Sequence, residues 1–357
     1  MSRKLFDSYE ALFNDDKIYE MSSTKEGIIW LKIKSILRKE YIIEFCRYFN
    51  VKLKSKVNSD IFFEIFNIVL ADLNIETNLD NFIRSQAAIM HQESINNLVS
   101  ELYKMRIFNW GGDYKNALDR YLVDAYVKKH MSYDVISSKL DNEIHQALTG
   151  YVYCSWYNHW STILIENIFK QHQKILPSIG NVKKVDFFIE GIPFDLKVTY
   201  LPNNYIDTIR KSRRLKSENA ILKQVAKDNK ISYATTYEMT EKLRNINDQR
   251  LLDLQDVKKD ILQEAISNPK LLINNLYEQQ GEMRFDASNR LFLILCDTKN
   301  FDDSWKLKRD IGLLQNAIFQ YLENFNISNI INNPISFRYK NRSATYHCLS
   351  DVIFVCV

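Results

Sequence analysis

Length, composition and charge exclude several classes of protein before any motif is considered. The chain has 357 residues, of which 46% are hydrophobic, so we expect a globular protein with two domains or one elaborated domain. The net charge of +4 is too small for the whole surface to attract nucleic acid, and such binding would have to rely on local clusters. Five scattered cysteines without a CxxC pattern argue against structural zinc and favour free thiols in a reducing compartment.

No stretch of the sequence approaches the ~18 apolar residues that a membrane-spanning helix requires. The N-terminus also lacks the apolar segment of a signal peptide. We therefore expect a cytoplasmic protein that does not contact the membrane.

The first 150 residues predict a mostly helical region. Glycine is rare and proline absent there, and apolar residues recur at helical spacing. The helical stretches are residues 26–50, 59–74, 77–105 and 115–130. We expect residues 1–150 to form one unit and residues 151–357 to form an α/β unit that follows it.

A tight β-hairpin is predicted over residues 185–200, directly after a predicted helix at residues 151–171. Two stretches rich in β-branched and aromatic residues flank Gly191, which supplies the positive φ angle that a two-residue turn requires. Such a turn places Asp186 opposite Asp195, so both side chains lie on the same face.

The two faces of this hairpin differ in character. One is wholly apolar and fixes the register, because a slip of one residue would bury the charges; its members are Phe187, Ile189, Ile192, Phe194, Leu196 and Val198. The other face carries Asp186, Asp195, Lys197 and Thr199.

Two carboxylates that face each other destabilise a sheet unless a cation compensates them. A divalent metal such as Mg²⁺, which prefers hard oxygen ligands, is the simplest compensation. Lys197 lies on the same face and would orient or activate an attacking water. The alternative is an ordinary solvated strand face, with Lys197 paired to one of the aspartates.

The spacing of these residues resembles the PD-(D/E)xK signature of the restriction-endonuclease-like nuclease superfamily. Asp186 is followed, after eight residues, by Asp195-Leu196-Lys197, although Val185 stands where the signature has proline. The resemblance implies an αβββαβ core with a mixed sheet over residues 151–357. It also implies catalytic roles for Asp186, Asp195, Lys197 and the helix residue Glu166, with the three carboxylates holding Mg²⁺, for which Mn²⁺ would substitute.

The rest of the chain fits such a core. A helical insertion over about residues 203–268 precedes a continuous apolar strand that begins at Arg290. An amphipathic helix at residues 304–325 follows, and residues 335–357 predict a closing hairpin with its turn near Asn341.

Basic residues near the motif are candidates for contact with DNA phosphates. The alternative for most of them is a solvated helix face, and for a lone helix histidine a structural role. The candidates are Lys183, Lys184, Arg210, Lys211, Arg213, Arg214, Lys216 and His159. Neither a GxxxxGK[ST] nor a GxGxxG loop is present, so the chain does not encode ATP-driven translocation.

Together these features predict a Mg²⁺-dependent endonuclease that cuts double-stranded DNA, most simply a type II-like restriction enzyme. Such an enzyme implies a homodimer and a cognate DNA methyltransferase in the same cell. The N-terminal helices would contribute DNA contacts or dimerisation. The alternatives are a structure-specific repair or junction nuclease and a non-catalytic nucleic-acid-binding protein of the same fold, and an RNA target also remains open.

Overall fold

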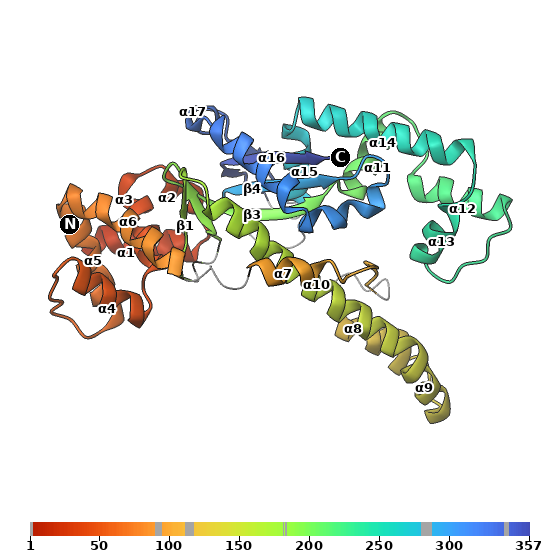
Figure 1. Cartoon of the computed structure of the whole chain (residues 1–357), viewed down its shortest axis with the longest axis horizontal. Coiled ribbons are helices and arrows are strands. Elements are labelled where there is room, and N and C mark those ends of the chain that lie inside the picture. Colours follow the sequence, from red (N-terminus) through yellow and green to blue (C-terminus); the bar gives the residue numbers. More distant parts are fainter. Residues whose placement is uncertain are drawn as a thin grey trace.

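The computed structural model describes residues 3–89, 95–110, 118–180, 182, 184–279, 288–338 and 343–357. It is an α/β structure built around a five-stranded mixed sheet in the order β1-β2-β3-β4-β7 (Figure 1). The five strands are β1 (Ile175–Pro177), β2 (Phe187–Ile189), β3 (Ile192–Tyr200), β4 (Arg290–Cys296) and β7 (Ser350–Cys356). β1, β2 and β3 pair antiparallel, whereas β3, β4 and β7 pair parallel.

Six helices form an N-terminal unit, in agreement with the helical spacing of the sequence. They are α1 (Arg3–Asn14), α2 (Ile18–Ser22), α3 (Lys25–Ser35), α4 (Lys39–Tyr48), α5 (Asn58–Ala71) and α6 (Leu73–Ile89). The single helical stretch predicted over residues 26–50 is in fact two helices. The break follows Ser35, and the N–H groups of Ile36 and Leu37 donate to carbonyls only three residues back, which ends the α-helical pattern.

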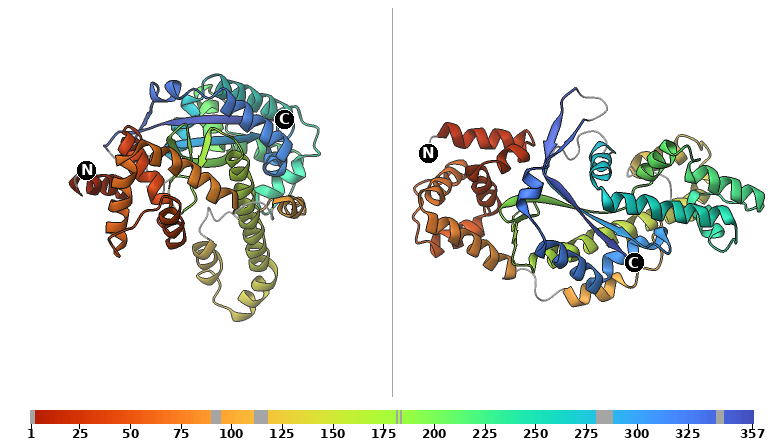
Figure 2. Two further views of the ribbon diagram at one scale, coloured as in Figure 1. Left: turned by 60° about the vertical axis from the view of Figure 1, so that its left-hand side comes forward. Right: turned by 90° about the horizontal axis from the view of Figure 1, so that it is seen from above.

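A long helical arm follows the N-terminal unit. It comprises α7 (Ile95–Leu102), α8 (Leu118–Leu122), the π-helix η1 (Val123–Val127), α9 (Tyr133–Lys139), the π-helix η2 (Leu140–Ile144) and α10 (His145–Lys170). The tip of the arm, from α8 to the start of α10, projects away from the sheet (Figures 1 and 2). The unit boundary expected at residue 150 falls inside α10, because this helix continues without a break from the arm into the sheet region.

As predicted, the insertion between β3 and β4 is helical: its described residues contain helices and no strand. It holds α11 (Asn203–Ser212), α12 (Glu218–Asp228), α13 (Thr236–Leu243), α14 (Gln249–Ser267) and α15 (Lys270–Gln279). Between β4 and β7 lie the 3₁₀-helix η3 (Phe301–Arg309), α16 (Ile311–Glu323) and α17 (Ile327–Ile331). The helix predicted over residues 304–325 is thus a 3₁₀-helix followed by an α-helix that Asp310 caps through the Leu313 N–H.

The closing hairpin predicted over residues 335–357 is only partly present. β5 (Ile335–Phe337) and β6 (Tyr346–Cys348) pair antiparallel, and the turn predicted near Asn341 lies outside the described residues. The last strand, β7, leaves this hairpin and joins the main sheet parallel to β4. Although β7 is an edge strand, its residues pack into the cores on both faces of the sheet.

Helices cover both faces of the sheet. One face packs against the C-terminal part of α10 and against α16, and the other packs against α11, α14 and α15. The N-terminal helices pack over the β1–β2 end through Leu176, Val185 and Phe188. From α10 onward the described residues form a helix, three strands, the helical insertion and β4, and β7 lies at one edge of the sheet. None of the described helices is long and apolar enough to cross a bilayer.

Candidate active site

The predicted hairpin is present with the predicted register. Ile189 pairs with Ile192 and Phe187 with Phe194. Beyond the last pair, the Asp186 N–H still donates to the Phe194 carbonyl at 2.9 Å, so the hairpin pairing reaches the first acidic residue.

The turn has the conformation that a two-residue hairpin favours. Gly191 has φ +91° and Glu190 has φ +48°, so both central residues are in the left-handed region, as a type I′ turn requires. Glycine accepts this conformation without strain, whereas glutamate does not. The conformation of Glu190 therefore costs free energy locally, and the packing of the two buried strands offsets this cost.

The apolar face of the hairpin lies in the main core, as predicted. Five of its six residues are fully buried there together with α10 and α16, and Val198 is partly buried against the same core: the five are Phe187, Ile189, Ile192, Phe194 and Leu196. The rings of Phe169 and Phe187 stack at 4.9 Å between centroids. This packing directs Asp195 and Lys197 to the opposite face.

The segment before β2 fixes the position of Asp186. Val185 is buried against the N-terminal helices, and the Asp186 carbonyl accepts a hydrogen bond from the Ser178 N–H at 3.0 Å. The carboxylate itself accepts the Leu196 N–H at 2.7 Å through Oδ2. Oδ2 is therefore occupied by a hydrogen bond within the hairpin. Oδ1 is the oxygen better placed to bind a ligand.

Asp195 is compensated by two cations of the protein itself. The Lys197 ammonium donates to Asp195 Oδ1 at 2.7 Å, and Arg290 Nε lies 3.4 Å from Oδ2. Asp195 is 6% exposed and Arg290 is fully buried. Facing aspartates are expected to need compensating positive charge. For Asp195, Lys197 and Arg290 of the chain itself supply it.

Arg290 is a site residue that the sequence analysis did not identify. It opens β4 and lies opposite Asp195 in the parallel register of β3 and β4. Its guanidinium also lies 4.8 Å from the centre of the Tyr277 ring. A charged residue at the head of an otherwise wholly apolar strand was the available signal, because such a residue is rarely buried without a partner.

Asp186, in contrast, keeps an excess of negative charge around it. Burial, Asp195 and Glu166 together raise the pKa of Asp186 to about 7, against a smaller lowering effect of the Leu196 hydrogen bond and Lys197. Glu166 on α10 therefore lies close enough for its charge to act on Asp186. Glu166 also pairs with Lys170, whose Nζ is 3.3 Å from Oε2.

The three carboxylates do not form a closed metal cage. Among the described residues, no group of three or more His, Cys, Asp or Glu side chains lies in a metal-binding arrangement. Mg²⁺ does not need such a cage, because one or two carboxylates together with water and substrate phosphate oxygens are its usual ligands. An Mg²⁺ ion at this hairpin would draw on Asp186 Oδ1 and on Asp195, whose two oxygens already contact Lys197 and Arg290.

The basic residues predicted to contact DNA have different surroundings. Lys211, Arg214 and Lys216 are exposed at the end of α11 and in the segment after it. Arg213 pairs with Glu264 at 2.5 Å. Arg210 is buried and donates through Nε to the Lys216 carbonyl at 2.9 Å, so its guanidinium supports the local fold and is not among the residues that we propose to contact DNA.

The remaining candidates lie nearer the hairpin or on the arm helix. Lys184 forms an ion pair with Asp16 of the N-terminal unit, and Lys183 lies outside the described residues. His159 is exposed on α10, and its ring contacts that of Trp160.

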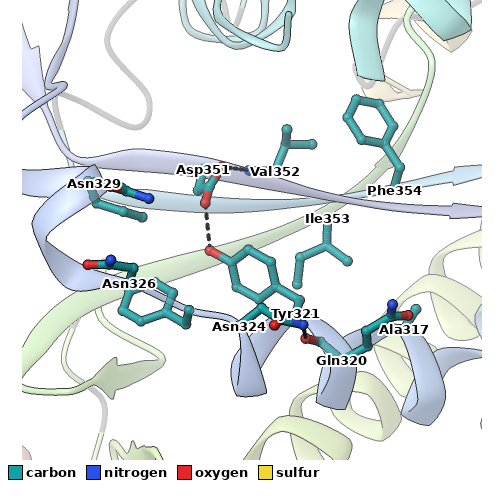
Figure 3. Close-up of a pocket in the computed structure, with 12 residues that line it drawn as sticks. Ala317, Gln320, Tyr321, Asn324, Asn326, Asn329, Asp351, Val352, Ile353 and Phe354 are labelled. Atoms are coloured by element: carbon teal, nitrogen blue, oxygen red, sulfur yellow. Dashed lines mark hydrogen bonds between the residues drawn. The ribbon is translucent and has the colours of Figure 1, made fainter. Parts of the chain in front are cut away.

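One cavity lies away from the hairpin. It has a volume of about 360 Å³ and lies along α16, α17 and β7 (Figure 3). In its wall the Tyr321 hydroxyl donates to Asp351 Oδ2 at 2.9 Å, and burial raises the pKa of Asp351. None of the residues that line this cavity belongs to the hairpin.

Comparisons with protein-family models, with curated proteins and with solved structures gave no match. The function of the chain must therefore be inferred from the residues themselves.

Proposed function

We propose that the chain is a Mg²⁺-dependent endonuclease of the PD-(D/E)xK type that hydrolyses phosphodiester bonds in double-stranded DNA. The observation that carries this proposal is the charge balance on one hairpin. Asp195 is held between two cations, whereas Asp186 lies beside two further carboxylates and is not neutralised. Carboxylates whose charge the protein does not compensate are typical of metal-binding and catalytic sites.

Each residue has a proposed role in the reaction. Asp186 and Asp195 would hold Mg²⁺, and Glu166 would add negative charge from α10. The bound Mg²⁺ would supply Lewis-acid polarisation of the phosphate and neutralise its charge. Lys197 would orient the attacking water and stabilise the negative charge that develops on the phosphate oxygens. Its present contact with Asp195 keeps the ammonium on the reacting face of β3.

Arg290 would act through Asp195 and would not touch the substrate. Because Arg290 is fully buried, it cannot reach a phosphate in solution. Its guanidinium would hold the Asp195 carboxylate in a fixed orientation, which preorganises one proposed metal ligand. We therefore treat Arg290 as a positioning residue.

The exposed cations Lys211, Arg214 and Lys216 support contact with the DNA backbone. Contacts of this kind would position the duplex without reading its sequence. Their location in the insertion after β3 connects them directly to the strand that carries Asp195 and Lys197.

A second copy of the chain would complete a double-strand cut, since each strand of a duplex needs its own site. The helical arm supports this proposal because apolar side chains at its tip are exposed, namely Val127, Met131, Tyr133 and Leu140. Exposed apolar side chains on a projecting element are typical of surfaces that bind another protein chain. A restriction role would further imply a cytoplasmic location and a methyltransferase partner in the same cell.

Cleavage of unmethylated phage DNA tests the proposal. Wild type with Mg²⁺ is compared with wild type in EDTA and with Asp186→Asn, Asp195→Asn and Lys197→Ala. The controls Asp207→Asn and Lys299→Ala change exposed residues of the same types outside the site. Circular dichroism and thermal melting establish that each variant is folded.

We expect discrete fragments from wild type and both controls, and intact DNA from the three site variants and from the EDTA sample. Cleavage of branched but not linear DNA would replace the restriction role with that of a repair or junction nuclease. Intact DNA with Mg²⁺ and with Mn²⁺, together with a retained gel shift, would overturn the catalytic role and leave a nucleic-acid-binding protein.

A further inference from the structure

An aromatic cavity lies at the end of the strand that carries the proposed catalytic residues. It has a volume of about 370 Å³ and is bordered by the last residues of β3, by α11 and α14, and by η3. Five aromatic side chains line it: Phe108, Trp110, Tyr200, Phe301 and Trp305. A cavity of this size that combines several aromatic side chains with a few polar groups suits one small planar molecule.

The cavity adjoins the proposed active site along β3. Thr199 lines it, and Thr199 shares the polar face of β3 with Lys197, two residues earlier. Two residues of a strand span about 7 Å, so the cavity begins roughly one nucleotide away from the Lys197 position. A strand whose phosphate lies at Lys197 would therefore bring a neighbouring nucleotide to the cavity mouth.

The charges in the wall favour a neutral ligand. Lys258 is buried, its ammonium lies 5.4 Å from the centre of the Phe301 ring, and it pairs with Glu218 at 2.6 Å. Asp302 is the acidic residue among those that line the cavity. Among the described residues that line the cavity, Lys258 is the only cation and is already paired, whereas the aromatic side chains suit a nucleobase.

The aromatic walls are held in place before any ligand arrives. The rings of Phe108 and Trp305 stack at 5.5 Å between centroids, and the Trp305 carbonyl accepts the Tyr157 hydroxyl at 2.9 Å. Trp305 is 6% exposed and belongs to the cluster that joins η3 to α10. A wall that is already ordered loses little entropy on binding, which favours stacking of an inserted ring.

We propose that this cavity binds an unpaired nucleobase of the strand next to the phosphate that is cleaved. This inference rests on the proposed nuclease function for its position, but base binding itself does not require cleavage. The base would stack on the aromatic walls, and the sugar-phosphate backbone would remain outside, toward Lys197. The site would make the enzyme sensitive to unstacked or unpaired positions in its substrate.

The test is fluorescence titration in EDTA with 2-aminopurine deoxyriboside 5′-monophosphate, whose emission falls when it stacks on aromatic rings. We expect saturable quenching that deoxyadenosine 5′-monophosphate reverses and deoxyribose 5-phosphate does not. Phe301→Leu keeps apolar bulk but removes the ring, and we expect it to weaken binding about fivefold or more. Phe319→Leu is the matched control, because Phe319 is also partly buried but lies on α16, outside the cavity walls.

A second variant covers the possibility that Phe301→Leu disturbs the fold. Asn203→Phe places a ring at the cavity from an exposed position, and we expect it to block binding without loss of thermal stability. Absence of saturable quenching, equal competition by deoxyribose 5-phosphate, or full binding by both variants would overturn the proposal. The binding assay contains no Mg²⁺, so it tests the cavity independently of cleavage. Base binding without DNA cleavage would support this site and contradict the nuclease function, and cleavage without base binding would support the nuclease function and contradict this site.

Discussion

Asp195 and Arg290 lie opposite each other on the parallel strands β3 and β4, with Arg290 Nε 3.4 Å from Asp195 Oδ2. Both side chains are buried, and Asp195 also accepts a hydrogen bond from Lys197. The Asp195 carboxylate, the proposed metal ligand, is thus paired inside the sheet with a guanidinium that solvent does not reach. Removal of either partner would leave the other uncompensated in a medium of low polarity.

The Arg290→Met variant tests this dependence. We expect it to lower the free energy of unfolding by about 3–5 kcal/mol, because it leaves Asp195 with one cation fewer and removes the contact with Tyr277. Urea denaturation measures the loss. The double variant Asp195→Asn with Arg290→Met should recover part of it, whereas Arg120→Met, at an exposed position, should stay within about 0.5 kcal/mol of wild type. Wild-type stability of Arg290→Met would show that the pair contributes nothing.

The raised pKa of Asp186 predicts a pH-dependent stability. Burial, Asp195 and Glu166 raise this pKa to about 7 from its usual 3.8. Between these values the folded chain keeps a proton that the unfolded chain has lost, so stability falls as the pH rises from about 4 to about 7. Thermal melting in EDTA should therefore show a lower melting temperature at pH 8 than at pH 5, with a smaller difference for Asp186→Asn. An unchanged difference in the variant would exclude Asp186 as the titrating group.

The same excess charge predicts stabilisation by metal. At pH 8, where Asp186 is ionised in the folded chain, Mg²⁺ should raise the melting temperature of wild type, because a ligand that binds only the folded state stabilises it. Asp186→Asn should respond less, and the exposed control Asp207→Asn should respond as wild type does. Equal shifts in all three proteins would indicate a general salt effect and no site at the hairpin.

The hairpin and its polar face were predictable because their causes are local. Gly191 fixes the turn, and the apolar pairs Phe187–Phe194 and Ile189–Ile192 fix the register. Both signals lie within one short stretch of sequence. The helix that carries Glu166 was likewise visible from its spacing, although its continuation into the arm was not.

The surroundings of the aspartates could not be predicted, because they depend on contacts between distant parts of the chain. Arg290 reaches Asp195 only because β4 pairs with β3 across a long helical insertion. Asp186 is held in place by a segment that packs on the N-terminal helices, through Val182 and Val185. Sheet order and the packing of separate units decide such contacts, and neither is encoded in the spacing of a motif.

The turn of the hairpin offers a pair of opposite predictions. Glu190→Asn should raise the free energy of unfolding by up to about 1 kcal/mol, since asparagine accepts the positive φ at this position better than glutamate does. Gly191→Ala should lower it by about 1–2 kcal/mol through backbone strain alone, because no atom lies within 4 Å of the added Cβ position. Urea denaturation measures both. Equal effects of the two changes would argue against the type I′ turn.

The contact between Gly180 and Ser35 joins the N-terminal unit to the segment that precedes Asp186. A Cβ atom at Gly180 would lie 2.1 Å from the Ser35 carbonyl oxygen, so a side chain there must push α3 away. We expect Gly180→Ala to lower the free energy of unfolding by about 1–3 kcal/mol and to reduce DNA cleavage, since the support of Asp186 is displaced. Gly312→Ala is the matched control, because its Cβ would meet only Asp310 Oδ1 at 3.9 Å and alanine favours the helix. If both alanine variants melt and cleave alike, the close approach of α3 does not position the site, and the N-terminal unit must serve the protein in another way.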